Sequence, residues 1–165
     1  MAIDPAREFR PINIALLTVS DTRTADDDTS GDILAERINR AGHRLAARAI
    51  EKDDAAILAT RLNSWIDDPR IDAIITTGGT GLTGRDVTPE ALDRVKDKDI
   101  PGFGELFRML SYEQVGAAAM LTRACAGVVT GCVVFVLPGS EPAVRLAMEK
   151  LILPELGHVV RETSR

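Results

Sequence analysis

Short apolar runs alternate with amphipathic segments along the first half of the chain, and this alternation constrains the fold most strongly. Apolar runs at 12–19, 43–50 and 71–77 are separated by segments at 29–42 and 53–69, whose apolar residues recur every three or four positions. The runs are typical of buried strands and the periodic segments of helices. Because the order strand, helix, strand, helix, strand favours right-handed crossovers, we predict an α/β fold. The expected architecture is a Rossmann-like three-layer α/β/α sandwich with a mostly parallel sheet.

Polar residues mark where the predicted helices begin. Thr29 or Ser30 is predicted to cap the first helix, and Asp53 or Asp54 the second, because these side chains accept hydrogen bonds from the first free N–H groups. Thr88 is predicted to cap a helix that follows the third strand. Further along, the pattern predicts helices over 103–110, 113–125 and 141–156 and a last buried strand over 133–137.

Length and composition narrow the class of protein. The 165 residues suit one domain over 1–165, with 1–11 as a loose N-terminal segment that lacks the apolar core of a signal peptide. A net charge of −5 argues against nucleic-acid binding, which needs clustered Lys and Arg. No apolar stretch approaches the roughly 18 residues of a membrane span. Cys125 and Cys132 lack metal-ligand spacing, so we predict free buried thiols and a cytoplasmic location.

The loop that follows the third predicted strand is the most distinctive local feature. Thr76-Thr77-Gly78-Gly79-Thr80-Gly81 places three glycines within four positions, which leaves backbone N–H groups open to a ligand. Such a loop between a strand and a helix can bind phosphate without net positive charge. It matches neither the P-loop pattern nor the dinucleotide fingerprint. The alternative is a purely structural tight turn.

Polar residues follow several predicted strands, and one carboxylate lies close to the glycine loop. Asp86 comes five residues after Gly81, where it can bind magnesium or assist a phosphate reaction, the alternative being a surface turn. Because parallel strands end at one edge of a sheet, we expect the following strand ends to gather there: Ser20-Asp21, Asp53, Thr76-Thr77 and Pro138-Gly139-Ser140. Ligands of α/β proteins bind at that edge.

Other charged residues have weaker claims to a role in function. Arg108 and Arg123 can grip a ligand phosphate, although an ordinary surface arginine fits the spacing equally well. The run 26–28 of three aspartates can attract a cation, but a solvated loop is the better interpretation. His43 and His158 are isolated, and we assign neither a role.

Several stretches resemble one known family. They are T-V-S-D-T-R at 18–23, T-T-G-G-T-G-L-T-G-R-D-V-T-P-E-A at 76–91, G-F-G-E-L-F-R-M-L-S at 102–111 and L-P-G-S at 137–140. They are similar to the MoaB/Mog family of molybdenum cofactor biosynthesis over about 12–156. The D-D-T-S-G segment and R-M-L-S resemble the MoaB branch more closely than Mog.

The resemblance implies a molybdopterin-binding fold that assembles as a homotrimer or homohexamer. In active members of the family, AMP passes from ATP to the molybdopterin phosphate in a magnesium-dependent reaction that releases pyrophosphate. Asp53 and Asp86 match the two aspartates regarded as catalytic in the Mog branch, with magnesium placed on Asp86. Where Mog-type sequences commonly read L-S-R, this chain has Leu121-Thr122-Arg123.

From these observations we predict a set of substrate-binding residues: Ser20, Asp21, Thr77, Gly78, Gly79, Thr80, Gly81, Thr88, Glu105, Arg108, Ser111, Thr122, Arg123, Pro138, Gly139 and Ser140. The leading hypothesis is a molybdopterin adenylyltransferase that uses ATP and Mg²⁺. One alternative is a non-catalytic molybdopterin-binding or scaffold protein of the same pathway. Another is a nucleotide-binding domain unrelated to the pterin pathway.

Overall fold

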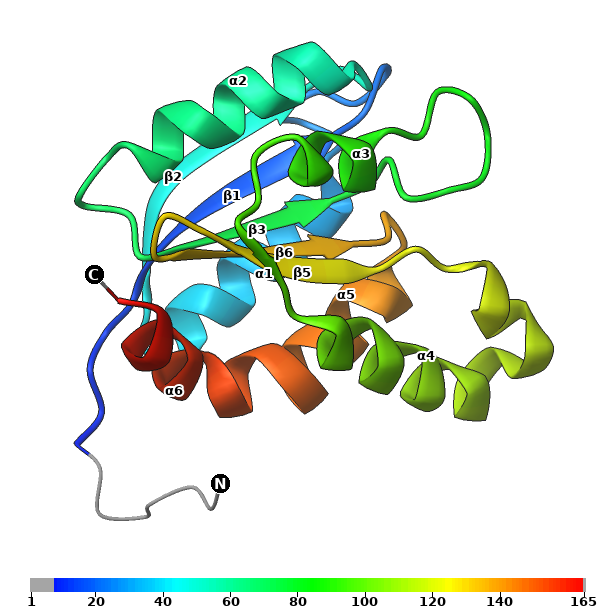
Figure 1. Cartoon of the computed structure of the whole chain (residues 1–165). Helices are drawn as coiled ribbons and strands as arrows, with labels where there is room; N and C mark the ends of the chain where they lie inside the picture. Colours follow the sequence, from blue (N-terminus) through cyan, green and yellow to red (C-terminus); the bar gives the residue numbers. More distant parts are fainter. Residues whose placement is uncertain (1–7, 165) are drawn as a thin grey trace.

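The computed structural model describes residues 8–164, and its centre is a six-stranded sheet in the order β2-β1-β3-β6-β5-β4 (Figure 1). The strands are β1 (Asn13–Val19), β2 (Arg44–Glu51), β3 (Ala73–Thr77), β4 (Lys98–Asp99), β5 (Cys125–Val129) and β6 (Cys132–Leu137). β2, β1, β3 and β6 pair in parallel, whereas β5 runs antiparallel to both of its neighbours. The predicted mostly parallel sheet is confirmed.

Helices cover both faces of this sheet. They are α1 (Thr29–Arg40), α2 (Ala55–Ile66), α3 (Thr88–Asp93), α4 (Pro101–Val115), the 3₁₀ helix η1 (Gly116–Leu121), α5 (Glu141–Ala147), the π-helical turn η2 (Met148–Ile152) and α6 (Leu153–Thr163). Side chains along β1 alternate between two cores: Ile14 and Leu16 pack with α1, α4, α5 and α6, whereas Ala15 and Leu17 pack with α2 and α3. Figure 1 shows the resulting three layers, so the predicted α/β/α sandwich is confirmed.

Two of the predicted helix caps differ from those in the structure. The first helix is capped by Asp28, whose carboxylate accepts from the Gly31 N–H at 3.0 Å, and not by a Ser or Thr. Asp54 caps α2 as predicted. Thr88 does not cap α3; Val87 occupies that position, and the Thr88 hydroxyl donates to the Gly78 carbonyl at 2.9 Å. The Thr88 hydroxyl, predicted to cap α3, is therefore bonded to the glycine loop instead.

The region 113–125 was predicted as one helix, and this was wrong. α4 ends at Val115 because Gly116 adopts a positive φ of 63°, and a short 3₁₀ segment follows. The chain then forms the hairpin β5–β6, whose turn places Thr130 and Gly131 at φ 46° and 82°. Two positive φ values in a two-residue turn match the twist of antiparallel strands. The predicted loose segment 1–11 lies partly outside the described residues; residues 8–11 belong to no helix or strand.

Candidate functional site

The site lies where the strand order reverses direction. β1 lies between β2 and β3, so the chain leaves β1 toward one side to form β2 and crosses to the other side to form β3. In α/β sheets, ligands bind beyond the carboxyl ends of the strands at such a reversal. The Gly78 N–H bonds the Leu137 carbonyl at 2.9 Å, and the Thr77 hydroxyl bonds the Pro138 carbonyl at 3.1 Å. A Cβ on Gly139 would meet the Gly78 Cα at 3.3 Å. The loops after β3 and β6 are therefore in contact, as predicted from their sequences.

The glycine loop has the backbone geometry of a ligand-binding turn. Gly78 and Gly79 have φ values of 98° and 66°, which L side chains rarely adopt. A Cβ on Gly78 would meet the Val19 carbonyl oxygen, and one on Gly79 would meet the Thr88 hydroxyl and the Asp53 carboxylate. Neither glycine can be replaced without displacing its neighbours. Close packing against β1 and Asp53 fixes the position of this loop.

Three aspartates from three different loops surround the glycines. Asp21 follows β1, Asp53 follows β2, and Asp86 precedes α3; the Asp53 N–H donates to Asp21 Oδ1 at 3.3 Å. Burial raises the pKa of Asp53, and the nearby charges of Asp21 and Asp86 raise it further. Its Oδ1 is buried and has no hydrogen-bond partner among residues 8–164. An orphaned carboxylate oxygen of this kind is suited to a cation or a proton supplied by a ligand.

Asp86 has the opposite electrostatic environment. Its Oδ2 accepts from the Thr83 hydroxyl at 2.5 Å and from the Thr83 N–H at 3.1 Å. The hydroxyl hydrogen bond lowers the pKa of Asp86, more strongly than burial raises it. The carboxylate also lies against Gly81, where a Cβ would approach Oδ2 to 2.7 Å. Asp86 is therefore held ionised at the rim of the loop, close to the less exposed Asp53.

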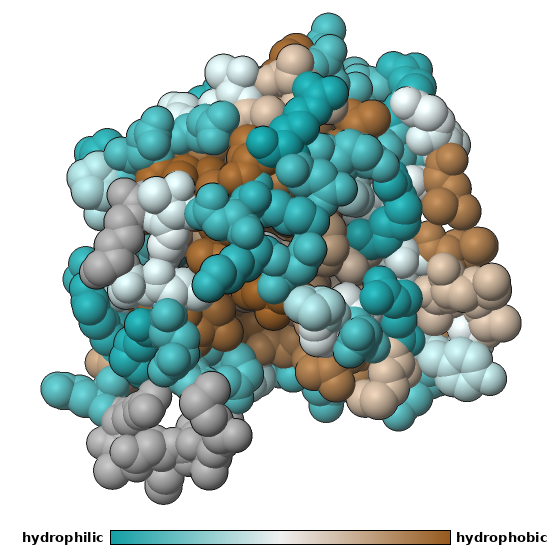
Figure 2. All heavy atoms as spheres, in the orientation of Figure 1, coloured by the Kyte–Doolittle hydropathy of each residue, from teal (hydrophilic) through white to brown (hydrophobic). Residues whose placement is uncertain are grey.

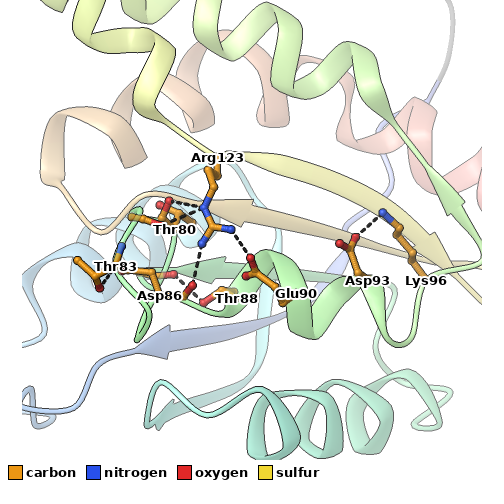
Figure 3. Close-up of polar contacts among 10 residues, drawn as sticks. Thr80, Thr83, Asp86, Thr88, Glu90, Asp93, Lys96 and Arg123 are labelled. Atoms are coloured by element: carbon orange, nitrogen blue, oxygen red, sulfur yellow. Dashed lines mark hydrogen bonds and ion pairs between the residues drawn. The ribbon is translucent and has the colours of Figure 1, made fainter.

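Arg123 holds the outer part of the loop together (Figure 3). Its Nε donates to the Thr80 and Gly81 carbonyls at 3.3 and 2.9 Å, and an Nη donates to the Asp86 carbonyl at 2.7 Å. The other Nη forms an ion pair with Glu90 on α3. The guanidinium that we expected to bind a phosphate is thus engaged with the backbone of the loop that would do so.

The remaining predicted site residues have local contacts and exposures of their own. Ser20 forms a local turn, accepting from the N–H groups of Thr22 and Arg23 at 3.3 and 3.1 Å. Arg108 on α4 donates to the Ala124 carbonyl at 3.3 Å. The others are Glu105, exposed on α4; Ser111, buried on α4; Thr122, whose buried Oγ1 has no partner; and Ser140, exposed at the start of α5.

Sequence reasoning missed Arg85 as part of this region. Its guanidinium forms an ion pair with the Asp21 carboxylate and so bridges the loops after β1 and β3. The signal was present, because Arg85 is the cation within the loop 81–86 and directly precedes Asp86. Asp28, which was predicted to lie in a solvated loop, is instead fully buried. That carboxylate accepts from the Thr18 hydroxyl at 2.7 Å and from Arg48 at 2.8 Å, which anchors the start of α1.

The aspartates suit magnesium only when waters and substrate phosphates complete its set of ligands. Among the described residues, no group of three or more His, Cys, Asp or Glu side chains is arranged to hold a metal by itself. Magnesium is commonly held by one or two carboxylates together with waters and substrate phosphates. The orphaned Oδ1 of Asp53 and the ionised Asp86 fit that mode. The residues present are therefore compatible with a cation that arrives with a phosphate ligand.

The fold and the site together define an open α/β protein with a glycine-rich loop and adjoining carboxylates at its switch point. The chain belongs to the family of probable molybdopterin binding domains, whose model matches residues 15–158. The resemblance to the MoaB/Mog family is confirmed. In the described residues, no helix is long and apolar enough to cross a membrane.

The names of similar proteins support a place in the MoaB branch. The molybdenum cofactor biosynthesis protein B of Bacillus subtilis is 49% identical, over 100% of this chain and 99% of the relative. A crystal structure of a molybdenum cofactor biosynthesis protein B superposes with a TM-score of 0.92 at 47% identity, covering 95% of this chain and 98% of that one. The tungsten cofactor synthesizing protein MoaB of Pyrococcus furiosus has a TM-score of 0.84 at 36% identity, with 96% and 100% coverage.

Proposed function

We propose that this protein binds molybdopterin and transfers AMP from ATP to the terminal phosphate of the pterin. The observation that carries the proposal is the contact between the Gly79 backbone and the carboxylate of Asp53. It joins an anion-binding loop to an acidic group that has a free buried oxygen. A site that combines the two suits a phosphate reaction assisted by a cation, and is more than simple anion binding requires.

The proposed reaction is a direct transfer of the adenylyl group, without a covalent enzyme intermediate. An oxygen of the molybdopterin phosphate attacks the α-phosphorus of ATP, the bond from that phosphorus to the bridging oxygen breaks, and pyrophosphate leaves with the electron pair. The backbone N–H groups of Gly79 and Thr80 orient a phosphate for this attack, because the Gly78 N–H already bonds the Leu137 carbonyl. Asp53 and Asp86 would hold Mg²⁺, which would neutralise charge on the phosphates. No side chain becomes a covalent nucleophile.

The substrate-binding residues divide by role in this proposal. Gly79 and Thr80 present the anion-binding N–H groups, and Thr88 holds the loop in place by donating to the Gly78 and Gly79 carbonyls. Pro138 and Gly139 form the opposite wall of the crevice, with Ser140 at its rim. Residues on and after α4 are proposed to contact the pterin rather than the reacting phosphates; they are Glu105, Arg108, Ser111 and Thr122.

We further propose assembly into a homotrimer or homohexamer through the face formed by α4 and η1. Large apolar side chains are exposed there: Leu106, Met109, Tyr112, Val115, Met120 and Leu121 are between 47% and 78% exposed. Figure 2 shows apolar residues gathered on the side of the molecule where these two helices lie. Contiguous exposed apolar surface favours burial against another copy. Light scattering of Met109→Glu against the parent chain tests this, because a monomeric variant is expected.

A cytoplasmic setting is part of the same proposal. It is supported by the two cysteines, Cys125 and Cys132, neither of which lies in a disulfide. Burial raises the pKa of Cys125 to about 11, so this thiol stays protonated and unreactive at neutral pH.

The decisive assay mixes the purified protein with molybdopterin, ATP and Mg²⁺ and measures adenylylated pterin and pyrophosphate. Asp53→Asn and Asp86→Asn are each expected to reduce the rate by at least about 100-fold while pterin binding persists. Asp26→Asn is the matched control, since Asp26 is an exposed aspartate five residues beyond Asp21 in the loop between β1 and α1. If the parent chain binds pterin but forms no product, and its pterin binding survives Asp86→Asn without ATP dependence, the protein is a binding or scaffold protein instead.

A further inference from the structure

Arg85 occupies an unusual position beside the site. It lies in the loop 81–86, and its side chain is 76% exposed although it forms an ion pair with Asp21. The same Asp21 accepts a hydrogen bond from the Asp53 N–H. One end of this ion pair therefore belongs to the cluster of aspartates, and the other end projects toward solvent on the loop that carries Asp86.

The other arginines near the loop are already committed to the backbone. Arg123 donates to the carbonyls of Thr80, Gly81 and Asp86. Arg108 donates to the Ala124 carbonyl. Within residues 8–164, the recorded partner of Arg85 is a carboxylate on another loop. Arg85 can thus leave its partner without breaking the backbone contacts that shape the glycine loop.

Exchange of Arg85 from Asp21 to a phosphate is energetically easy. An exposed ion pair contributes only about 0–1 kcal/mol, so little is lost when it opens. A guanidinium forms two parallel hydrogen bonds with phosphate oxygens, and each is stronger than a neutral hydrogen bond. Opening the pair also frees the Asp21 carboxylate beside Asp53. A ligand carrying more than one phosphate gains most, because the glycine loop holds one phosphate and Arg85 reaches a second.

We propose that Arg85 binds the β- and γ-phosphates of the nucleotide, moving from Asp21 to this pyrophosphate unit when ATP enters. The assignment rests on the function proposed above and names the residue that holds the leaving group. Arg85 is then a substrate-contacting residue, and Asp21 is its partner in the empty site. AMP lacks the two outer phosphates, so its binding does not depend on Arg85.

The test is calorimetric titration of the full-length protein with sodium pyrophosphate without metal, with ATP and Mg²⁺, and with AMP. Arg85→Gln is expected to weaken pyrophosphate and ATP at least about fivefold and to leave AMP unchanged. Arg85→Lys restores part of the loss. Asp21→Asn is expected to strengthen metal-free pyrophosphate binding by up to about fivefold, because it removes the competing carboxylate.

Arg70→Gln is the matched control. Arg70 is 85% exposed and pairs with Asp68 in a similar surface ion pair, but it precedes β3 and lies at the opposite edge of the sheet. Its replacement should change none of the three affinities. Equal ATP and pyrophosphate affinities in Arg85→Gln and the parent chain overturn the assignment of Arg85 and leave the proposed function standing. A parent chain that binds neither ATP nor pyrophosphate overturns both.

Discussion

The backbone of Gly79 lies directly against the carboxylate of Asp53, so that a single added methyl group at Gly79 would collide with it. Two loops separated by a helix and a strand are thereby held in one fixed relationship. Under the proposed function, the loop presents backbone N–H groups to a phosphate and Asp53 contributes its buried Oδ1 to a cation. Phosphate binding and cation binding would then depend on the same contact.

Gly79→Ala should therefore disrupt both stability and ligand binding. Alanine at φ 66° is strained by about 1–2 kcal/mol, and its Cβ would displace Asp53 and the Thr88 hydroxyl. We expect a total loss of roughly 2–4 kcal/mol in the free energy of unfolding, measured by urea denaturation. Pterin binding should fall at least about tenfold, measured by fluorescence titration.

Gly84→Ala is the control for this substitution. Gly84 belongs to the same loop, but a Cβ there meets no atom within 4 Å. The change should alter the unfolding free energy by less than about 0.5 kcal/mol and leave pterin binding intact. Comparable losses in the two variants would show that the loop tolerates no side chain anywhere, and that the contact with Asp53 has no special role.

Arg123 is expected to keep the loop 80–86 ordered through its hydrogen bonds, rather than to act through its charge. Arg123→Lys removes the fork that reaches three carbonyls, so the unfolding free energy should fall by about 1–3 kcal/mol. Amide hydrogen exchange over 80–86 should accelerate. Glu90→Gln removes only the exposed ion pair and should cost at most about 1 kcal/mol. If exchange over 80–86 is the same in Arg123→Lys as in the parent chain, the guanidinium does not order the loop.

The first half of the fold was predictable because apolar runs and periodic helical segments alternate regularly in its sequence. Continuous apolar runs such as Ile14–Leu17 identified buried parallel strands, and Asp54 identified the start of α2. The strand predicted over 133–137 is confirmed as β6, whereas β5 and its hairpin with β6 were missed, although Val128-Val129-Thr130-Gly131 contains the turn. Alanines and leucines before it have high helical propensity, but Gly116, at φ 63°, ends the helix at Val115. The glycine was the local signal that the helical prediction overlooked.

The loops that form the candidate site were predictable from the sequence, whereas the hydrogen-bond partners of their side chains were less so. Glycines and strand-end aspartates pointed to the edge of the sheet, since topology alone brings parallel strand ends together. Which groups Arg123 and Thr88 would bond depends on backbone atoms that only folding places within reach. The burial of Asp28 was not predictable for the same reason. Its run of three aspartates resembles a solvated loop until Arg48 and Thr18 are brought beside it by β2 and β1.

Asp28→Ala tests that buried anchor. The substitution leaves the Thr18 hydroxyl and the Gly31 N–H without their acceptor and deprives Arg48 of one of its two carboxylate partners. We expect a loss of about 2–4 kcal/mol in the free energy of unfolding. Asp26→Ala, in the same run but exposed, should stay within about 0.5 kcal/mol. Equal effects in denaturant titrations would contradict the structural role given to Asp28.

His43 gives the fold a specific dependence on pH. Its Nδ1 accepts from the Ile12 N–H at 3.2 Å, its ring lies 5.3 Å from that of Phe9, and burial lowers its pKa below the ordinary value of 6.5. Protonation would turn the acceptor into a donor facing another donor. The unfolded chain therefore takes up the proton first as pH falls, and this contribution to stability declines below about pH 6.5 until the folded pKa is reached.

We expect the unfolding free energy to decrease between about pH 7.5 and pH 5.5, with a slope from this one group of at most about 1.4 kcal/mol per pH unit. His43→Asn keeps an acceptor near Ile12 but does not titrate, so its stability should fall less over the same interval. Urea denaturation at several pH values measures the slope, and an NMR titration of the imidazole gives the pKa directly. Identical slopes for the parent and His43→Asn would assign the pH dependence to other groups.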